Sequence, residues 1–444
     1  MFWGLHMIYL LISSSIAFAE PISLQDSLSL VSSQNPEVQI ARLQTDQVNL
    51  ERLKVLTNIL NVQASGSWLD FGEPLDTYII GDGSSDVDCT SFESFGFGDL
   101  CDSFSEPLRV RDEQIFDGSL QVALPISALY SIIEGYSANQ HLQDIKALEV
   151  EQTKQRIELS VVDIYLQTLD LQSQRKILED TLTRLGKHQQ SVQAFVDQGL
   201  AHPVQAKELN HAIQETTLGL RQLNQGYDLL CQQMSLLLGL SDPFSPLPLE
   251  DNIGAPKEEQ LSSNLSHRIA THQYQAAQDS VQAAAGNLVP TVALMAATTS
   301  TQGQGPFTPT SQQYLGLSVQ GEFGWGNKWM TFKQRQMDVT MAKQGLKIQQ
   351  QALPIQQQQL KQQWQHTLEQ VSLAESKIEI ENIKRTQAQA RFDGQQITVT
   401  DLLDAESRCA DAQIALLRTQ HKSILAQAKY QQSINADTLY FESQ

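Results

Sequence analysis

The chain has 444 residues, a formal net charge of −20 and 41% hydrophobic residues. Binding to nucleic acid needs clustered Lys and Arg opposite the phosphates, so this acidic balance argues against a nucleic-acid partner. After residue 20 no apolar run of about 18 residues occurs, so no membrane-spanning helix is expected. The modest hydrophobic content and the glutamine-rich tracts are typical of long amphipathic helices with wet faces.

Residues 1–19 are predicted to be a secretory signal peptide. They are apolar and end in Ala17-Phe18-Ala19, a small-x-small cleavage site before Glu20. The stretch lacks the usual Lys or Arg near its start, where only His6 stands. No Cys follows the site, which excludes a lipoprotein anchor, and a buried N-terminal helix is the alternative interpretation.

Residues 20–240 are predicted to be the first of two structural repeats. A helix broken at Asn35-Pro36 opens the repeat, and alternating apolar and polar side chains then predict a strand hairpin over 61–126. The expected order is a helix over 22–60, a strand over 61–71, a loop over 72–117, a strand over 118–126, a long helix over 127–196 and a return helix over 204–240.

A Pro-rich linker over 241–260 separates this half from the second repeat, 261–434. Inside the second long helix, Pro354 is expected to kink the helix or to mark a local break. The expected order is a helix over 261–286, strands over 288–298 and 313–323 that form the hairpin 288–323, a long helix over 327–392, a return helix over 400–434 and a C-terminal tail over 435–444.

The same order of elements therefore occurs twice, which indicates an internal duplication. Four strands of about ten residues each suit a tilted crossing of a bilayer. Two hairpins cannot close a barrel, and open sheet edges do not persist in lipid. If the strands cross a membrane, several copies of the chain must close the barrel together.

The segment between the last two helices carries the most distinctive pattern. We expect a turn through Gly394, N-caps at Thr398 and Thr400, and favourable negative charge from Asp401 and Asp404 in the first turn of the following helix. Mostly small side chains then recur at alternating steps of three and four, so a partner helix must approach closely. The residues of this seam are Leu402, Ala405, Cys409, Ala412, Leu416, Thr419, Ser423 and Ala426.

Three features resemble the TolC-like outer-membrane efflux proteins, or outer membrane factors: Asp-Leu-Leu-Asp-Ala over 401–405, Asn35-Pro36 in the first helix, and the duplicated order of elements. The resemblance implies a mixed fold in which long α-helical hairpins form a periplasmic coiled-coil tunnel below a transmembrane β-barrel. The resemblance further implies that each of three identical protomers would supply four strands to a twelve-stranded barrel in the outer-membrane lipid.

The resemblance also implies a function. The homotrimer would be the exit duct for an inner-membrane transporter and its periplasmic adaptor protein, in the efflux of small molecules. Two alternatives stay open: the duct of a type I protein secretion system, and a trimeric coiled-coil structural protein or adhesin, which needs no strand hairpins. The sequence contains no nucleophile elbow, phosphate loop or zinc pattern, so we expect no enzyme and no cofactor.

By the same resemblance, the carboxylates of Asp401 and Asp404 form the periplasmic gate. The alternative from the residues alone is ordinary helix-start charge plus a pair between Asp404 and Arg408. The resemblance also assigns the tip turns and the adaptor contact, although Gln395 and Gln396 stand where many relatives have a basic residue. These tip residues are Gly199, Leu200, Phe392 and Gly394.

The four cysteines divide into two pairs. Cys89 and Cys101 lie twelve residues apart in an extracellular loop of an oxidising compartment, so a disulfide between them is expected. Cys231 and Cys409 are expected to pack as small apolar side chains without bonding to each other. The nine histidines are scattered, and His267 and His272 share no face, so no metal site is predicted.

Overall fold

The structure is a computed structural model of the chain, and it describes residues 21–57, 59–77, 108–241, 243–249, 252–253, 264–304, 309–320, 325–434 and 441–442. The chain divides into two compact units, one made of 47–143 and 272–344 and the other of the remaining residues. The expected signal peptide and the expected pair Cys89–Cys101 lie outside the described residues.

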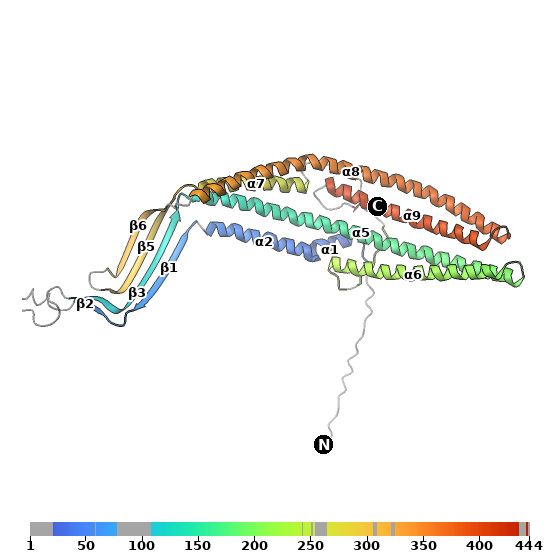
Figure 1. Cartoon of the computed structure of the whole chain (residues 1–444), viewed down its shortest axis with the longest axis horizontal. Helices are drawn as coiled ribbons and strands as arrows, with labels where there is room; N and C mark the ends of the chain where they lie inside the picture. The colour runs from blue at the N-terminus through green and yellow to red at the C-terminus, as the bar shows by residue number, and fades with distance from the viewer. Residues whose placement is uncertain are drawn as a thin grey trace, which may run out of the picture. The chain divides into compact units, whose positions relative to one another are not determined.

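The first unit is built on one antiparallel sheet with the strand order β1-β3-β5-β6 (Figure 1). The strands are β1 (Asn61–Asp70), β3 (Leu108–Pro125), β5 (Thr291–Gln304) and β6 (Ser311–Gln320), and a short β2 (Leu75–Thr77) pairs with β3. This confirms four main strands and a mixed fold. Pairing of β3 with β5 joins the two hairpins into one sheet and leaves β1 and β6 at its edges.

The sheet has one apolar and one polar face. Residues paired across an antiparallel ladder point to the same side, so the register assigns each side chain to a face. On one face, the apolar side chains come from all four main strands: Val62, Trp68, Phe116, Leu120, Val122, Leu294, Leu315, Leu317 and Val319. The opposite face is mostly polar, with Gln63, Ser65, Ser119, Gln121, Thr299 and Ser318.

The expected loop over 72–117 is wrong at its C-terminal end, because β3 begins at Leu108 rather than at residue 118. In this added part of the strand, Arg109 and Arg111 surround Val110, and Asp112 and Glu113 follow. Because most of these residues are charged, the segment lacks the alternation of apolar and polar side chains that predicts a strand. Pairing with β2 and an ion pair between Arg109 Nε and Asp76 Oδ1 at 3.3 Å hold this segment as a strand.

Long helices form the rest of the chain. They are α1 (Leu24–Gln34), α2 (Pro36–Thr57), α5 (Leu129–Asp197), α6 (Pro203–Leu238), α7 (Leu265–Gly286), α8 (Trp325–Asp393) and α9 (Val399–Ile434). In Figure 1, α6 folds back along α5, and α9 folds back along α8. Among the described helices, none combines the length and the apolarity that a membrane crossing would require.

Two prolines affect their helices differently. Asn35 ends α1, and its side-chain oxygen accepts hydrogen bonds from the backbone N–H groups of Glu37 and Val38, which begins α2 at Pro36 as expected. In contrast, α8 continues through Pro354, so the alternative of a local break there is wrong. Tertiary packing of a 69-residue helix outweighs the single hydrogen bond that a proline removes.

A core in the second unit packs α1, α5 and α6 together. Its largest fully buried side chains include Tyr165, Met234 and Leu238. The Tyr165 hydroxyl donates to the backbone oxygens of Ile22 and Leu247, at 3.1 and 2.7 Å, so this buried polar group is satisfied. Residues 243–249 of the predicted linker are thereby held against α5.

Candidate functional site

The two helix-to-helix turns have the same backbone geometry. After α5, the N–H of Gly199 donates to Val196 O and the N–H of Leu200 donates to Phe195 O. After α8, the N–H of Gln395 donates to Phe392 O and the N–H of Gln396 donates to Arg391 O. Both patterns are Schellman motifs, in which the residue after the C-cap has a left-handed conformation.

The chain turns at Gly394, the C-cap of α8, as the sequence predicts. The residue with positive φ in this turn is the next one, Gln395, at 57°. In the first turn Gly199 has the equivalent role, with φ of 72°. A glycine has no Cβ and adopts this conformation without penalty, whereas Gln395 adopts it despite its Cβ.

Of the expected tip residues, Leu200 and Gly394 are exposed, whereas Phe392 is 4% exposed. Phe392 lies between the rings of Phe195 and His188, with centroid separations of 6.1 and 6.3 Å. A buried cluster surrounds it, formed by Leu185, Val192, Leu209, Val399 and Leu402. Phe392 therefore anchors the two hairpins to each other beneath the exposed turns.

The start of α9 has a capping box. Thr398 is the cap: its Oγ1 accepts from the N–H of Asp401, and the Asp401 carboxylate accepts from the N–H and the hydroxyl of Thr398 at 3.1 and 2.7 Å. These hydrogen bonds lower the pKa of Asp401. The expectation of a second cap at Thr400 is wrong, because Thr400 lies inside the helix and its hydroxyl donates to Glu208.

Both predicted gate carboxylates are exposed on α9. Asp404 accepts a hydrogen bond from Arg408 at 3.0 Å, which is the i, i+4 pair that the sequence suggested. The neighbouring seam is buried at Leu402, Cys409 and Ala412, as small-residue packing requires. Cys231 and Cys409 are both free thiols and buried.

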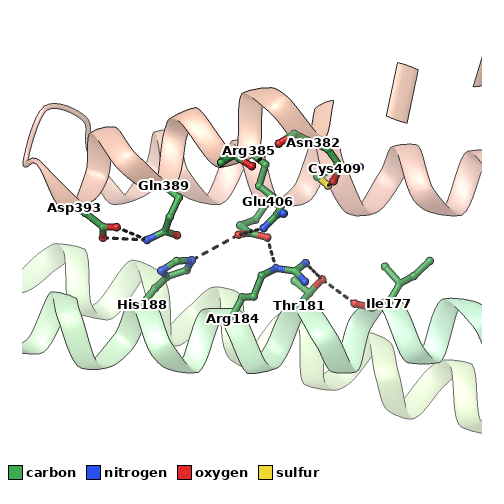
Figure 2. Close-up of polar contacts among 11 residues, drawn as sticks. Ile177, Thr181, Arg184, His188, Asn382, Arg385, Gln389, Asp393, Glu406 and Cys409 are labelled. Carbon is green, nitrogen blue, oxygen red and sulfur yellow. Dashed lines mark hydrogen bonds and ion pairs between the residues drawn. The ribbon is translucent and has the colours of Figure 1, made fainter. Parts of the chain in front are cut away.

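One buried carboxylate at this site was missed. Glu406, two residues after Asp404, is 2% exposed and lies between α5 and α8 (Figure 2). Arg184 Nε of α5 donates to its Oε2 at 2.8 Å, Arg385 of α8 approaches its Oε1 at 3.8 Å, and His188 Nε2 lies 3.6 Å from Oε1. A single carboxylate thus joins three helices next to the predicted gate.

Burial alone would raise the pKa of Glu406. The hydrogen bonds that its carboxylate accepts and the nearby positive charges of Arg184 and Arg385 outweigh this effect, so the pKa is lowered and the group is ionised. Figure 2 also shows Arg184 donating to Thr181 Oγ1, which in turn donates to Ile177 O. The only sequence signal for Glu406 was an acidic residue in the middle of an apolar helical seam.

A second cross-link of this kind joins α5 to α9 further from the turns. Asp170 of α5 lies 3.6 Å from Arg418 and 3.8 Å from His421 of α9. Burial raises the pKa of Asp170 and lowers the pKa of His421. At Glu406, α9 supplies the carboxylate and α5 supplies an Arg and a His. At Asp170 the roles are reversed, because α5 supplies the carboxylate and α9 supplies the Arg and the His.

No protein-family model matches the sequence, and no curated protein matches it. Solved structures match the fold. The outer-membrane channel OprN is 16% identical at a TM-score of 0.73, over 93% of this chain and 90% of that one. The outer membrane protein VceC from Vibrio cholerae is 12% identical at a TM-score of 0.74, over 93% and 97%. The CmeC outer membrane channel of Campylobacter jejuni is 11% identical at a TM-score of 0.71, over 94% and 87%. This chain has the fold of these channels.

Proposed function

We propose that this chain, whose fold is that of the TolC-like outer membrane factors, forms a homotrimeric exit duct in the outer membrane. Its helical tunnel would lie in the periplasm, and residues 1–19 would direct export from the cytoplasm. The duct would receive small molecules from an inner-membrane transporter through a periplasmic adaptor protein, so that they cross both membranes. The two-faced sheet with its unpaired edges carries this proposal.

The sheet supports a barrel assembled from several copies. Its apolar face, which includes Leu315, Leu317 and Val319 of β6, is exposed in the single chain, whereas the opposite face is largely polar. Alternation of this kind suits strands with lipid on one side and a water-filled lumen on the other. The edges β1 and β6 must pair in lipid, and pairing β6 of one copy with β1 of the next satisfies both. Three copies of four strands would give the expected twelve.

At the other functional region, Asp401 and Asp404 would supply six carboxylates around one aperture. Both side chains are exposed on α9, and the capping box fixes Asp401 at the first helical turn. Close like charges concentrate cations at a pore mouth, and di- or trivalent cations bridge carboxylates. The closed duct should therefore conduct cations preferentially and be blocked by such ions.

The exposed turns at Leu200 and Gly394 would contact the adaptor, with Phe392 supporting them from beneath. A type I secretion duct would have the same architecture, and profiling secreted proteins and drug sensitivity in a deletion strain separates the two. A coiled-coil adhesin or spacer has no use for the sheet, whose four main strands and apolar face weigh against it.

Single-channel recording from the purified protein in planar bilayers tests the duct and its gate. We expect cation-selective openings that trivalent cations block. The double change Asp401→Ala and Asp404→Ala should abolish the block and weaken the selectivity. The matched control, Glu369→Ala with Glu375→Ala, removes the same charge from two exposed positions of α8 well before the turn and should leave both unchanged. Wild-type block in the Asp401 and Asp404 variant would locate the gate elsewhere, and an absence of conductance would oppose the duct itself.

A further inference from the structure

Two histidines that are 131 residues apart in the sequence meet in the unit that contains the sheet. His141 lies on α5 and His272 on α7, and their Nδ1 atoms are 3.2 Å apart. The sequence reading paired His272 only with His267 on its own helix and therefore found no metal site. Neither His141 nor His272 has a role in the proposed gate or tip.

The separation of the two nitrogens suits one shared metal ion. With Zn–N bonds of about 2.0–2.1 Å and a tetrahedral angle, two ligand nitrogens lie roughly 3.3–3.4 Å apart. The observed 3.2 Å is within a few tenths of an ångström of that value. The rings are inclined by 46°, with centroids 5.4 Å apart, so they do not stack face to face.

A carboxylate lies where an outer-shell partner of such a site is expected. Nε2, the other ring nitrogen of His141, lies 3.7 Å from Oδ2 of Asp279 on α7. The same oxygen accepts a hydrogen bond from Ser137 at 2.6 Å, which fixes its position. Metal-binding histidines commonly donate their second N–H to a carboxylate, and this holds the lone pair of the first nitrogen toward the ion.

Water can complete the coordination shell of such an ion. The side chains of His141 and Asp279 are 24% and 17% exposed, and His272 is also only partly buried. The site is therefore enclosed by protein but open to solvent.

We propose that His141 and His272 bind one Zn²⁺ ion per chain, with Asp279 as the outer-shell partner of His141 and water in the remaining positions. Imidazole nitrogens disfavour Mg²⁺ and Ca²⁺, which take oxygen ligands, and the nitrogen separation suits the tetrahedral geometry of zinc. The ion cross-links α5 and α7. This site does not depend on the proposed transport function.

Calorimetric titration of the full-length protein with ZnCl₂ tests the site, after purification without a histidine tag and removal of metal by EDTA. The background carries Asp401→Asn and Asp404→Asn, so that gate carboxylates bind no zinc. We expect one Zn²⁺ per chain, about 100-fold weaker binding in His272→Ala, and roughly 10–100-fold weaker binding in Asp279→Asn. The control His366→Ala removes an exposed histidine of α8 and should bind zinc as the background does.

X-ray absorption at the zinc edge supplies a second measurement that does not depend on the stability of a variant. Two imidazole ligands per zinc ion support the site, and a shell of oxygen ligands alone overturns it. The proposal is also wrong if the background protein binds no zinc, or if His272→Ala binds it as tightly as the background while remaining folded. The two histidines would then form only a hydrogen-bonded pair.

Discussion

Gln395 has a left-handed backbone conformation that costs a side chain with a Cβ about 1–2 kcal/mol. Changing Gln395→Gly should therefore stabilise the protein by roughly 0.5–1 kcal/mol at the α8–α9 turn. At the equivalent turn, Gly199→Ala should destabilise it by a similar amount, because the same conformation is required there. Melting temperatures of the purified variants check both. If both substitutions shift the melting temperature in the same direction, the two turns do not share the same conformational requirement.

Glu158 is buried in α5 beside the core that includes Ile157, Val161 and Val162, and burial raises its pKa from 4.5 to about 7, against the opposing charge of Lys154. Since the folded protein favours the protonated form, the stabilisation is complete below pH 4.5 and is lost as the pH rises toward 7. This rise in pKa corresponds to roughly 3 kcal/mol as an upper value.

The contribution of Glu158 should accordingly make the wild-type protein melt at a higher temperature at pH 5 than at pH 8. Glu158→Gln imitates the protonated side chain and should remove most of this dependence and raise the melting temperature at pH 8. Glu149→Gln, a half-exposed position on the same helix, is the control and should retain the wild-type profile. An unchanged pH profile in Glu158→Gln would show that the group is ionised without penalty.

At the residue scale, the sequence predicted what depends on local chemistry. Thr398 was expected as an N-cap and Asp401 as a first-turn charge, because both signals depend on residues within one helical turn, and the structure joins the two in a capping box. Glu406 and His141 were missed as site residues, because their partners Arg184 and His272 lie 222 and 131 residues away. A single sequence has no periodicity that reports such a contact.

At the scale of elements, Glu406 joins α9 to α5 and α8. Glu406→Ala leaves the partly buried guanidinium groups of Arg184 and Arg385, each 27% exposed, without their carboxylate, which should cost up to about 3 kcal/mol. Asp404→Ala removes the exposed partner of Arg408 on the same helix and should cost less than about 1 kcal/mol. Thermal melting of the two variants measures the difference.

A double-mutant cycle isolates the pair. Glu406→Leu combined with Arg184→Met replaces both charges by apolar groups of similar size, and should be less destabilising than the sum of the single changes. Additive effects would show that the two side chains do not interact. The cycle also tests whether α5 and α9 are coupled directly, since the contact needs no other helix.

The lengths of the elements show where sequence reasoning is strong and where it fails. The helices α5 and α6 were predicted to within about two residues because apolar spacing persists over many turns and Pro203 marks the start of α6. The start of β3 was misplaced by ten residues, since charged side chains alternate there with few apolar ones. Where pairing with neighbouring strands stabilises a strand, its own sequence shows little of the apolar alternation that predicts a strand.

At the scale of the whole molecule, the proposed trimer requires lipid on one face of the sheet and water on the other. Leu317 is 70% exposed on the apolar face of β6, and the adjacent Ser318 points to the polar face. Arg on a lipid-facing strand costs about 2–4 kcal/mol near the bilayer centre, whereas Arg in a lumen is tolerated. Leu317→Arg should therefore greatly reduce the heat-modifiable trimer in outer-membrane fractions, and Ser318→Arg should assemble normally. Both changes lie on the same edge strand and add the same charge, and they place it on opposite faces of the sheet. If Leu317→Arg assembles as well as Ser318→Arg, the apolar face does not contact lipid, and an assembly outside the membrane would explain the exposed face better than a duct.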